Sequence, residues 1–87
     1  MLMEDITKQI QELSDKLCRQ TGLDLIRVKC SGRVNDVNIQ ITADKLPGVI
    51  TVGECAILNK ALVAAIEQKC LLTPGTFSLE VSSPGID

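Results

Sequence analysis

Apolar and polar positions alternate along this chain with two different periods, and the changes of period divide it into five elements. Between residues 3 and 21 the apolar positions recur every three or four residues, at Met3, Ile6, Ile10, Leu13 and Leu17. This is the period of a single helix face. Gly22 is suited to end the helix, with Leu23 packing back onto it as in a Schellman motif. The stripe predicts a helix docked on a sheet, because it is too short for a coiled-coil seam.

Two segments with a period of two follow, and they predict a β-hairpin. In residues 23–31 the predicted faces are Ile26, Val28 and Cys30 on one side and Leu25, Arg27 and Lys29 on the other. In residues 37–43 the apolar positions are Val37, Ile39, Ile41 and Ala43. The residues between the two segments favour a turn and predict a loop of about four to six residues. Each strand has one polar face, so one face of the sheet is expected to lie in water.

A second helix is predicted from Thr51 to about Lys69. Thr51 and Glu54 fit the S/T-x-x-E capping box, in which each residue satisfies a backbone amide of the other. The predicted core side consists of Cys55, Leu58, Leu62, Ala65, Ile66 and Lys69. Much of the remaining helix is also apolar. Either a partner covers part of that surface, or its alanines are simply exposed helix formers.

The last element is a third strand over residues 76–82, where Phe77, Leu79 and Val81 alternate with polar residues. Ser83-Pro84-Gly85 ends it, because proline lacks an amide hydrogen and Pro-Gly suits a tight turn. The order α-β-β-α-β places both helices on one face of a three-stranded sheet, which is a two-layer α+β sandwich. The pattern leaves the third strand beside either the first strand, in an antiparallel sheet, or the second, in a mixed one.

Composition and charge narrow the class of protein further. The chain has 87 residues, 45% of them hydrophobic, with a single aromatic residue and a net charge of −2. Residues 1–87 are therefore expected to form one domain with a modest aliphatic core. The whole-domain positive charge typical of nucleic-acid-binding proteins is absent. Only residues 24–45 are net positive, with Arg27, Lys29, Arg33 and Lys45 against Asp24, Asp36 and Asp44.

The residue types that enzymes and metal sites need are missing or scattered. The chain has no histidine, and Cys18, Cys30, Cys55 and Cys70 form no C-x-x-C pair, so no zinc ligand set is predicted. No Ser-His or Cys-His pair is possible, and no glycine-rich phosphate loop occurs. Residues 1–20 lack the apolar core of a signal peptide, and no apolar run could span a membrane. The sequence indicates a non-enzymatic cytoplasmic protein with buried free thiols, without metal, cofactor, small-molecule substrate or membrane contact.

Three stretches carry a resemblance to a known family. Residues 77–87, Phe-Ser-Leu-Glu-Val-Ser-Ser-Pro-Gly-Ile-Asp, resemble the segment that closes the N-terminal domain of the ribosome maturation factor RimP family. Gly22-Leu23-Asp24-Leu25 is similar to the entry into the family's first strand, and Ile50-Thr51 with Cys55-Ala56 resembles the start of its second helix. The resemblance covers essentially the whole chain, although the tyrosine often found in the family's second strand is absent.

The resemblance implies an α/β domain with a layout like that of type II KH domains. In the family an SH3-like barrel follows this domain. That barrel is absent from these 87 residues, and the abrupt end at Asp87 suggests a domain cut from a longer protein. The GxxG loop with which KH domains hold single-stranded RNA is also absent, which argues against KH-style clamping.

The family's function suggests what such a domain would bind. The resemblance implies a cytoplasmic, non-enzymatic factor that binds the immature 30S ribosomal subunit and helps it mature, with 16S rRNA and ribosomal protein S12 as partners. The rival function is a protein–protein adaptor or dimerisation domain that uses the apolar back of the second helix. Such an adaptor would self-associate or bind a protein without RNA.

Two surfaces are candidate contact sites. The first is a basic stripe on the predicted hairpin, with Arg33 at its tip, which would contact rRNA phosphates: Arg27, Lys29 and Arg33. The alternative is an ordinary solvated sheet face. The second is the turn that would set the angle to a second domain and border the ribosome contact: Ser82, Ser83, Pro84 and Gly85. The alternative here is a plain strand terminator.

Overall fold

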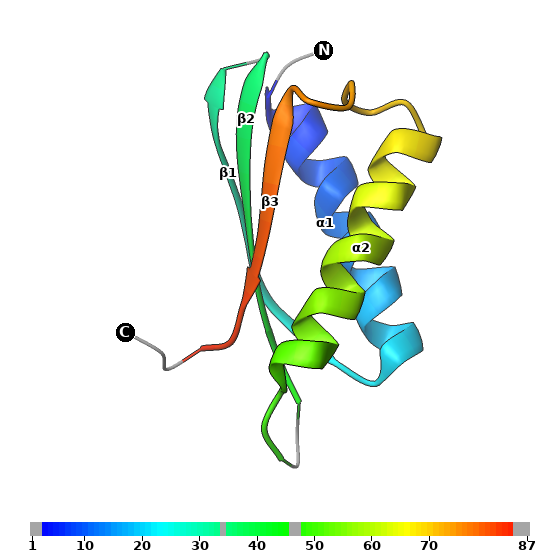
Figure 1. Ribbon diagram of the computed structural model, residues 1–87. Coiled ribbons are helices and arrows are strands. Elements are labelled where there is room, and N and C mark those ends of the chain that lie inside the picture. The colour runs from blue at the N-terminus through cyan, green and yellow to red at the C-terminus, as the bar shows by residue number, and fades with distance from the viewer. Residues whose placement is uncertain (1–2, 34, 46–47, 85–87) are drawn as a thin grey trace.

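The structure, a computed structural model, describes residues 3–33, 35–45 and 48–84 as two helices packed on one face of a three-stranded sheet (Figure 1). In chain order the elements are α1 (Met3–Thr21), β1 (Asp24–Arg33), β2 (Asp36–Asp44), α2 (Val52–Gln68) and β3 (Phe77–Ser82). The sheet order is β1-β2-β3, with β1 antiparallel and β3 parallel to the central strand β2. The predicted two-layer α+β fold is confirmed, and the sheet is the mixed alternative.

Helix α1 faces the sheet with a row of residues four positions apart. Ile6, Ile10, Ser14 and Cys18 are all buried, whereas Leu13 and Leu17 are only half-buried at the edge of the row. The predicted stripe is therefore shifted by part of a turn, and the side chain of Met3 lies outside what is described. The Ser14 hydroxyl donates to the Ile10 carbonyl at 2.7 Å, so this buried polar group is satisfied within its own helix.

Both helices end in a Schellman motif, but with different residues at the left-handed position. At the end of α1, Leu23 N–H donates to the Cys18 carbonyl at 2.8 Å, and Gly22 has a φ of +75°, as predicted. At the end of α2, Leu71 N–H donates to the Ile66 carbonyl at 3.1 Å. The left-handed residue there is Cys70, with a φ of +55°. A Cβ atom makes this conformation unfavourable, and glycine avoids that cost.

The substitution Cys70→Gly is expected to stabilise the protein by about 0.5–1 kcal/mol, because it removes the left-handed penalty and sacrifices little packing. Cys70 is exposed, so its side chain contributes little to the core. Urea unfolding measures the change. The matched control is Cys70→Ala, which removes the thiol but keeps the Cβ atom. A glycine variant no more stable than the alanine variant would contradict this account of the helix end.

A β-bulge at Ile26 changes which side chains of β1 face the helices. Leu25 pairs with Ala43 and Arg27 with Thr42, so Ile26 has no partner in β2. Ile26 is 54% exposed, and Leu25 takes the core-facing place instead. The predicted faces were wrong at these two positions, because the extra residue of a bulge reverses the alternation on one side of it. Beyond the bulge, Val28 and Cys30 face the core as predicted.

The two strands of the hairpin are longer than predicted and the connection between them is shorter. Arg33 closes β1 directly opposite Asp36, the first residue of β2, so two residues join the strands in place of the predicted four to six. The central strand has the cleanest alternation in the sheet. Its four core-facing residues, Val37, Ile39, Ile41 and Ala43, are completely buried, and Phe77, Leu79 and Val81 of β3 lie beside the first three of them.

Helix α2 begins with the predicted capping box. Glu54 N–H donates to the Thr51 hydroxyl, and Thr51 N–H donates to the Glu54 carboxylate, each at 3.1 Å. Hydrogen bonds from Thr51 and the nearby Lys45 hold the pKa of Glu54 below its usual value. Leu58, Leu62 and Ile66 form the buried row of the helix. The prediction that Lys69 belongs to the core side was wrong. It is the exposed C-cap residue, one position beyond Gln68, the last residue of the helix.

Candidate functional site

The face of the sheet that the helices leave uncovered presents polar side chains from all three strands. Three rows of side chains cross it from β1 to β3. They are Ser31–Asn38–Ser78, Lys29–Gln40–Glu80 and Arg27–Thr42–Ser82. All nine residues are exposed except Thr42, which is half-buried. We call this surface the open face. It follows directly from the period of two in each strand, which places the intervening apolar residues against the helices.

The three predicted basic residues all lie on β1, along one edge of the open face. Lys29 stands in the second of the rows just given and Arg27 in the third, and Arg33 ends the strand opposite Asp36. The ion pairs within the described residues are Arg19–Asp15 and Lys45–Glu54. No carboxylate of the described residues therefore forms an ion pair with Arg27, Lys29 or Arg33. The structure places these cations as a stripe, free to meet an external anion, although their contact with a partner stays a prediction.

The first residue of the predicted C-terminal turn, Ser82, lies on the open face. Ser82 is the last residue of β3 and belongs to the row of Arg27 and Thr42. Ser83 is half-buried and Pro84 is exposed, whereas Gly85 lies outside the described residues. The structure thus brings part of the turn onto the open face. Its role at a domain boundary stays a prediction.

The sequence interpretation missed the middle of the open face. Asn38, Gln40 and Thr42 on β2 lie between the basic stripe and β3, and they supply amide and hydroxyl groups that both donate and accept hydrogen bonds. Their alternation with buried residues was visible in the sequence. Their position between the other two strands was not visible, because the sequence did not decide whether β3 lies beside β1 or beside β2.

A second surface lies where α2 passes the outer edge of β3. The side chains of Val52, Cys55, Ala56, Asn59, Lys60, Leu79, Glu80 and Val81 line a groove of about 390 Å³ there. The Asn59 amide donates to the Leu79 carbonyl at 2.9 Å, so one backbone acceptor on this strand edge is already occupied. Val49, Val52 and Ile57 are 79%, 87% and 62% exposed near the start of α2. The helix therefore does present apolar surface to solvent.

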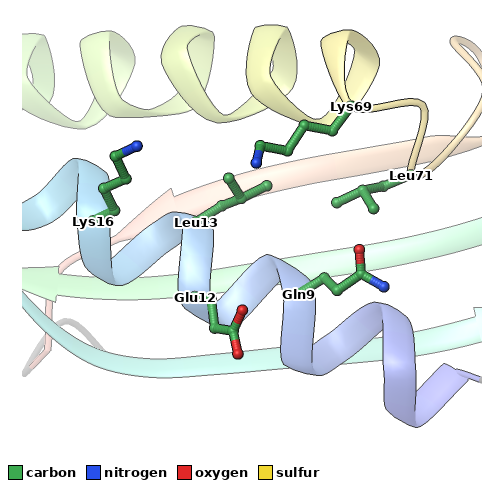
Figure 2. Close-up of a pocket in the computed structure, with 6 residues that line it drawn as sticks. All are labelled: Gln9, Glu12, Leu13, Lys16, Lys69 and Leu71. Carbon is green, nitrogen blue, oxygen red and sulfur yellow. The ribbon is translucent and has the colours of Figure 1, made fainter.

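A third, smaller groove of about 220 Å³ separates the two helices on the far side of the molecule from the open face. In Figure 2 the side chains of Lys16 and Lys69 extend over this groove from α1 and from the end of α2, while Glu12 points away from it. Leu13 and Leu71 form its half-buried apolar lining. Its two lysines lie in the helix layer, so they offer a comparison for the cations of the open face.

The cysteines give no indication of metal or redox chemistry. All four are free, and among the described residues no three Cys, Asp or Glu side chains gather as metal ligands. Burial raises the pKa of the Cys18, Cys30 and Cys55 thiols, which keeps them protonated and poorly nucleophilic near neutral pH. The prediction of buried thiols is confirmed for Cys18, whereas Cys30 and Cys55 are only partly buried, and it was wrong for Cys70, which is exposed.

The two helices can also be compared with the length and apolar character of a membrane-spanning helix. Within residues 3–33, 35–45 and 48–84, neither α1 nor α2 combines the length and the apolar character needed to cross a bilayer.

Fold and surfaces together define a small two-layer α+β domain whose polar sheet face is left open. A family model described as RimP N-terminal domain matches residues 13–87. The chain therefore belongs to the RimP N-terminal domain family, as the resemblance of its closing segment indicated. This is a family of ribosome maturation factors, connected with the small ribosomal subunit and not known as enzymes.

Proposed function

We propose that this domain acts in the cytoplasm by binding the immature 30S subunit, with its open face directed at 16S rRNA. Contact with ribosomal protein S12 is part of the same proposal, carried over from the family resemblance. The observation that supports the proposal best is the stripe of Arg27, Lys29 and Arg33, whose cations pair with no carboxylate among the described residues. Unpaired cations on a flat, solvated surface are suited to phosphate contacts.

The physical consequence of such contacts is dependence on salt. Each phosphate neutralised by a lysine or arginine releases condensed counterions, and the binding constant then falls steeply as salt rises. The contacts carry no sequence information by themselves, so they would hold the domain on rRNA without choosing a sequence. The net charge of the chain is −2, so attraction to rRNA has to come from this local stripe.

The double substitution Arg27→Glu and Arg33→Glu is expected to weaken association with immature small subunits, and more so at low salt. If two phosphate contacts are lost, the ratio of wild-type to variant affinity should be roughly tenfold larger at 50 mM than at 200 mM salt. Co-sedimentation of the purified chain with precursor subunits over this salt range measures the ratio. Mature large subunits serve as the negative control particle.

The matched control variant is Lys16→Glu with Lys69→Glu, which makes the same change of charge in the groove between the helices (Figure 2). It should leave the affinity close to that of the wild type. Equal losses in both variants would mean that net charge, rather than the open face, governs binding. Unchanged binding of the open-face variant at every salt concentration would refute the proposal.

A second function is favoured by one observation, the exposure of Val49, Val52 and Ile57 near the start of α2. These side chains would suit a protein–protein adaptor or a dimerisation domain. The two functions separate in the same experiment. An adaptor self-associates or binds a protein without RNA, whereas a maturation factor sediments with small subunits and not with mature large ones.

A further inference from the structure

The open face carries side chains of a restricted chemistry. Its central strand presents Asn38, Gln40 and Thr42, with Ser78 and Ser82 beside them on β3. These are short amide and hydroxyl groups, which both donate and accept hydrogen bonds. The cations of β1 line one side of them, and the span from Arg27 to Arg33 is about 20 Å along the strand. The face is thus a hydrogen-bonding surface with positive charge along the β1 edge and one carboxylate, Glu80, on β3 in the row of Lys29 and Gln40.

Aromatic rings are missing from this face. Phe77 is the single aromatic residue of the chain. It stands beside the buried Val37 on the helix side of the sheet and packs against the core. Within the described part of the three strands, Ile26 at the bulge is the one large apolar side chain that is mostly exposed. The open face therefore offers no ring on which an unpaired base could stack.

The two common forms of RNA need different surfaces. Single strands are held by aromatic side chains that stack on splayed bases, and stacking supplies much of the affinity. Double-stranded RNA is recognised through its phosphates and 2′-hydroxyl groups, which its wide and shallow minor groove displays. The open face has the groups for the second task and lacks those for the first.

We propose that the open face binds double-stranded, A-form segments of RNA in preference to single strands. The cations of β1 contact phosphates along one backbone, and the amides of Asn38 and Gln40 contact 2′-hydroxyl groups. This inference rests on the proposed function, since it takes RNA as the partner of the same face. It adds the structural class of RNA and the residues that distinguish RNA from DNA.

The experiment is a titration of the isotopically labelled 87-residue chain, followed by nuclear magnetic resonance at low salt. The probes are an RNA hairpin duplex, an unstructured RNA single strand with the same number of phosphates, and a DNA duplex of the hairpin sequence. Amide shifts are expected along β1 and β2. The RNA duplex should bind about fivefold more tightly than either other probe, as expected for one or two additional hydrogen bonds.

The substitutions Asn38→Ala and Gln40→Ala together should reduce the preference for the RNA duplex over the DNA duplex to about one. Both side chains are exposed, so their loss leaves the core intact. The matched control removes two exposed amides of α1, by Gln11→Ala and Gln20→Ala, and should leave the preference unchanged. Equal loss in both variants would overturn the assignment to Asn38 and Gln40.

The outcomes separate this inference from the proposed function. If the single strand binds as tightly as the RNA duplex, or if DNA and RNA duplexes bind equally, the inference is wrong and the proposed function is unaffected. The same holds if no RNA probe shifts the open-face amides while Arg27→Glu with Arg33→Glu still weakens subunit association. If that variant also leaves subunit association unchanged, the proposed function fails with the inference.

Discussion

Replacing Ile39 by alanine is expected to lower the free energy of unfolding by about 4 kcal/mol, near the upper end of the range for such substitutions in protein cores. Ile39 is completely buried on the central strand. Cys30 and Leu79 lie beside it on the neighbouring strands, so little can move in to fill the cavity. A domain of this length is stable by only about 4–13 kcal/mol in total. Urea unfolding followed by circular dichroism measures the loss.

The next residue in the strand supplies the matched control. Gln40 is exposed on the open face, and Gln40→Ala should change the stability by less than about 0.5 kcal/mol. The contrast between two consecutive residues tests the two-layer arrangement itself. Comparable losses at Ile39 and Gln40 would mean that both faces of the sheet are covered, and the open face would then be unavailable to any partner.

Replacing Gly32 by alanine should cost about 2–3 kcal/mol, because its positive φ strains any residue with a Cβ atom. Gly32 has a φ of +97°, and a Cβ atom there would collide with the backbone carbonyl oxygen of Asp36 across the hairpin. The neighbouring strand must shift to admit the methyl group. Urea unfolding measures the cost, and the amide spectrum should show displaced signals at this end of β1 and β2.

Gly22 offers the comparison that isolates the collision. Its φ is also positive, at +75°, but no atom lies within 4 Å of the position a Cβ atom would take. Gly22→Ala should therefore cost only the backbone strain, about 1 kcal/mol. If both substitutions lower the free energy of unfolding equally, the close approach between Gly32 and Asp36 adds nothing to the cost of a Cβ atom at Gly32.

These effects connect the fold to the proposed function. Arg33 follows Gly32 directly, so a distorted hairpin end would also displace one cation of the basic stripe. The helices bury the apolar side of the sheet, and its other side presents ordered rows of polar groups. Stability comes from one face of the sheet, and binding is proposed for the other. Substitutions on the open face should therefore change binding without unfolding the domain.

Local patterns were sufficient for the elements and for much of the site. The period of two in residues 37–43 predicted the buried and exposed residues of β2, because adjacent side chains of a strand point to opposite faces. Thr51 with Glu54 predicted the start of α2, and Gly22 the end of α1, because such ends depend on hydrogen bonds between residues close in sequence. The same patterns put Arg27 and Lys29 on the polar face.

Features that depend on contacts between distant segments were decided by the tertiary structure alone. The place of β3 beside β2 sets the three rows of the open face, and nothing local distinguishes it from a place beside β1. The bulge that exposes Ile26 and buries Leu25 arises from the register between two strands. Lys69 follows the apolar spacing of α2 yet is the exposed residue that follows the end of the helix at Gln68. The sequence by itself thus determined the elements and the faces of their regular stretches, because these depend on residues close in the chain, whereas packing between distant segments decided the strand order and the bulge.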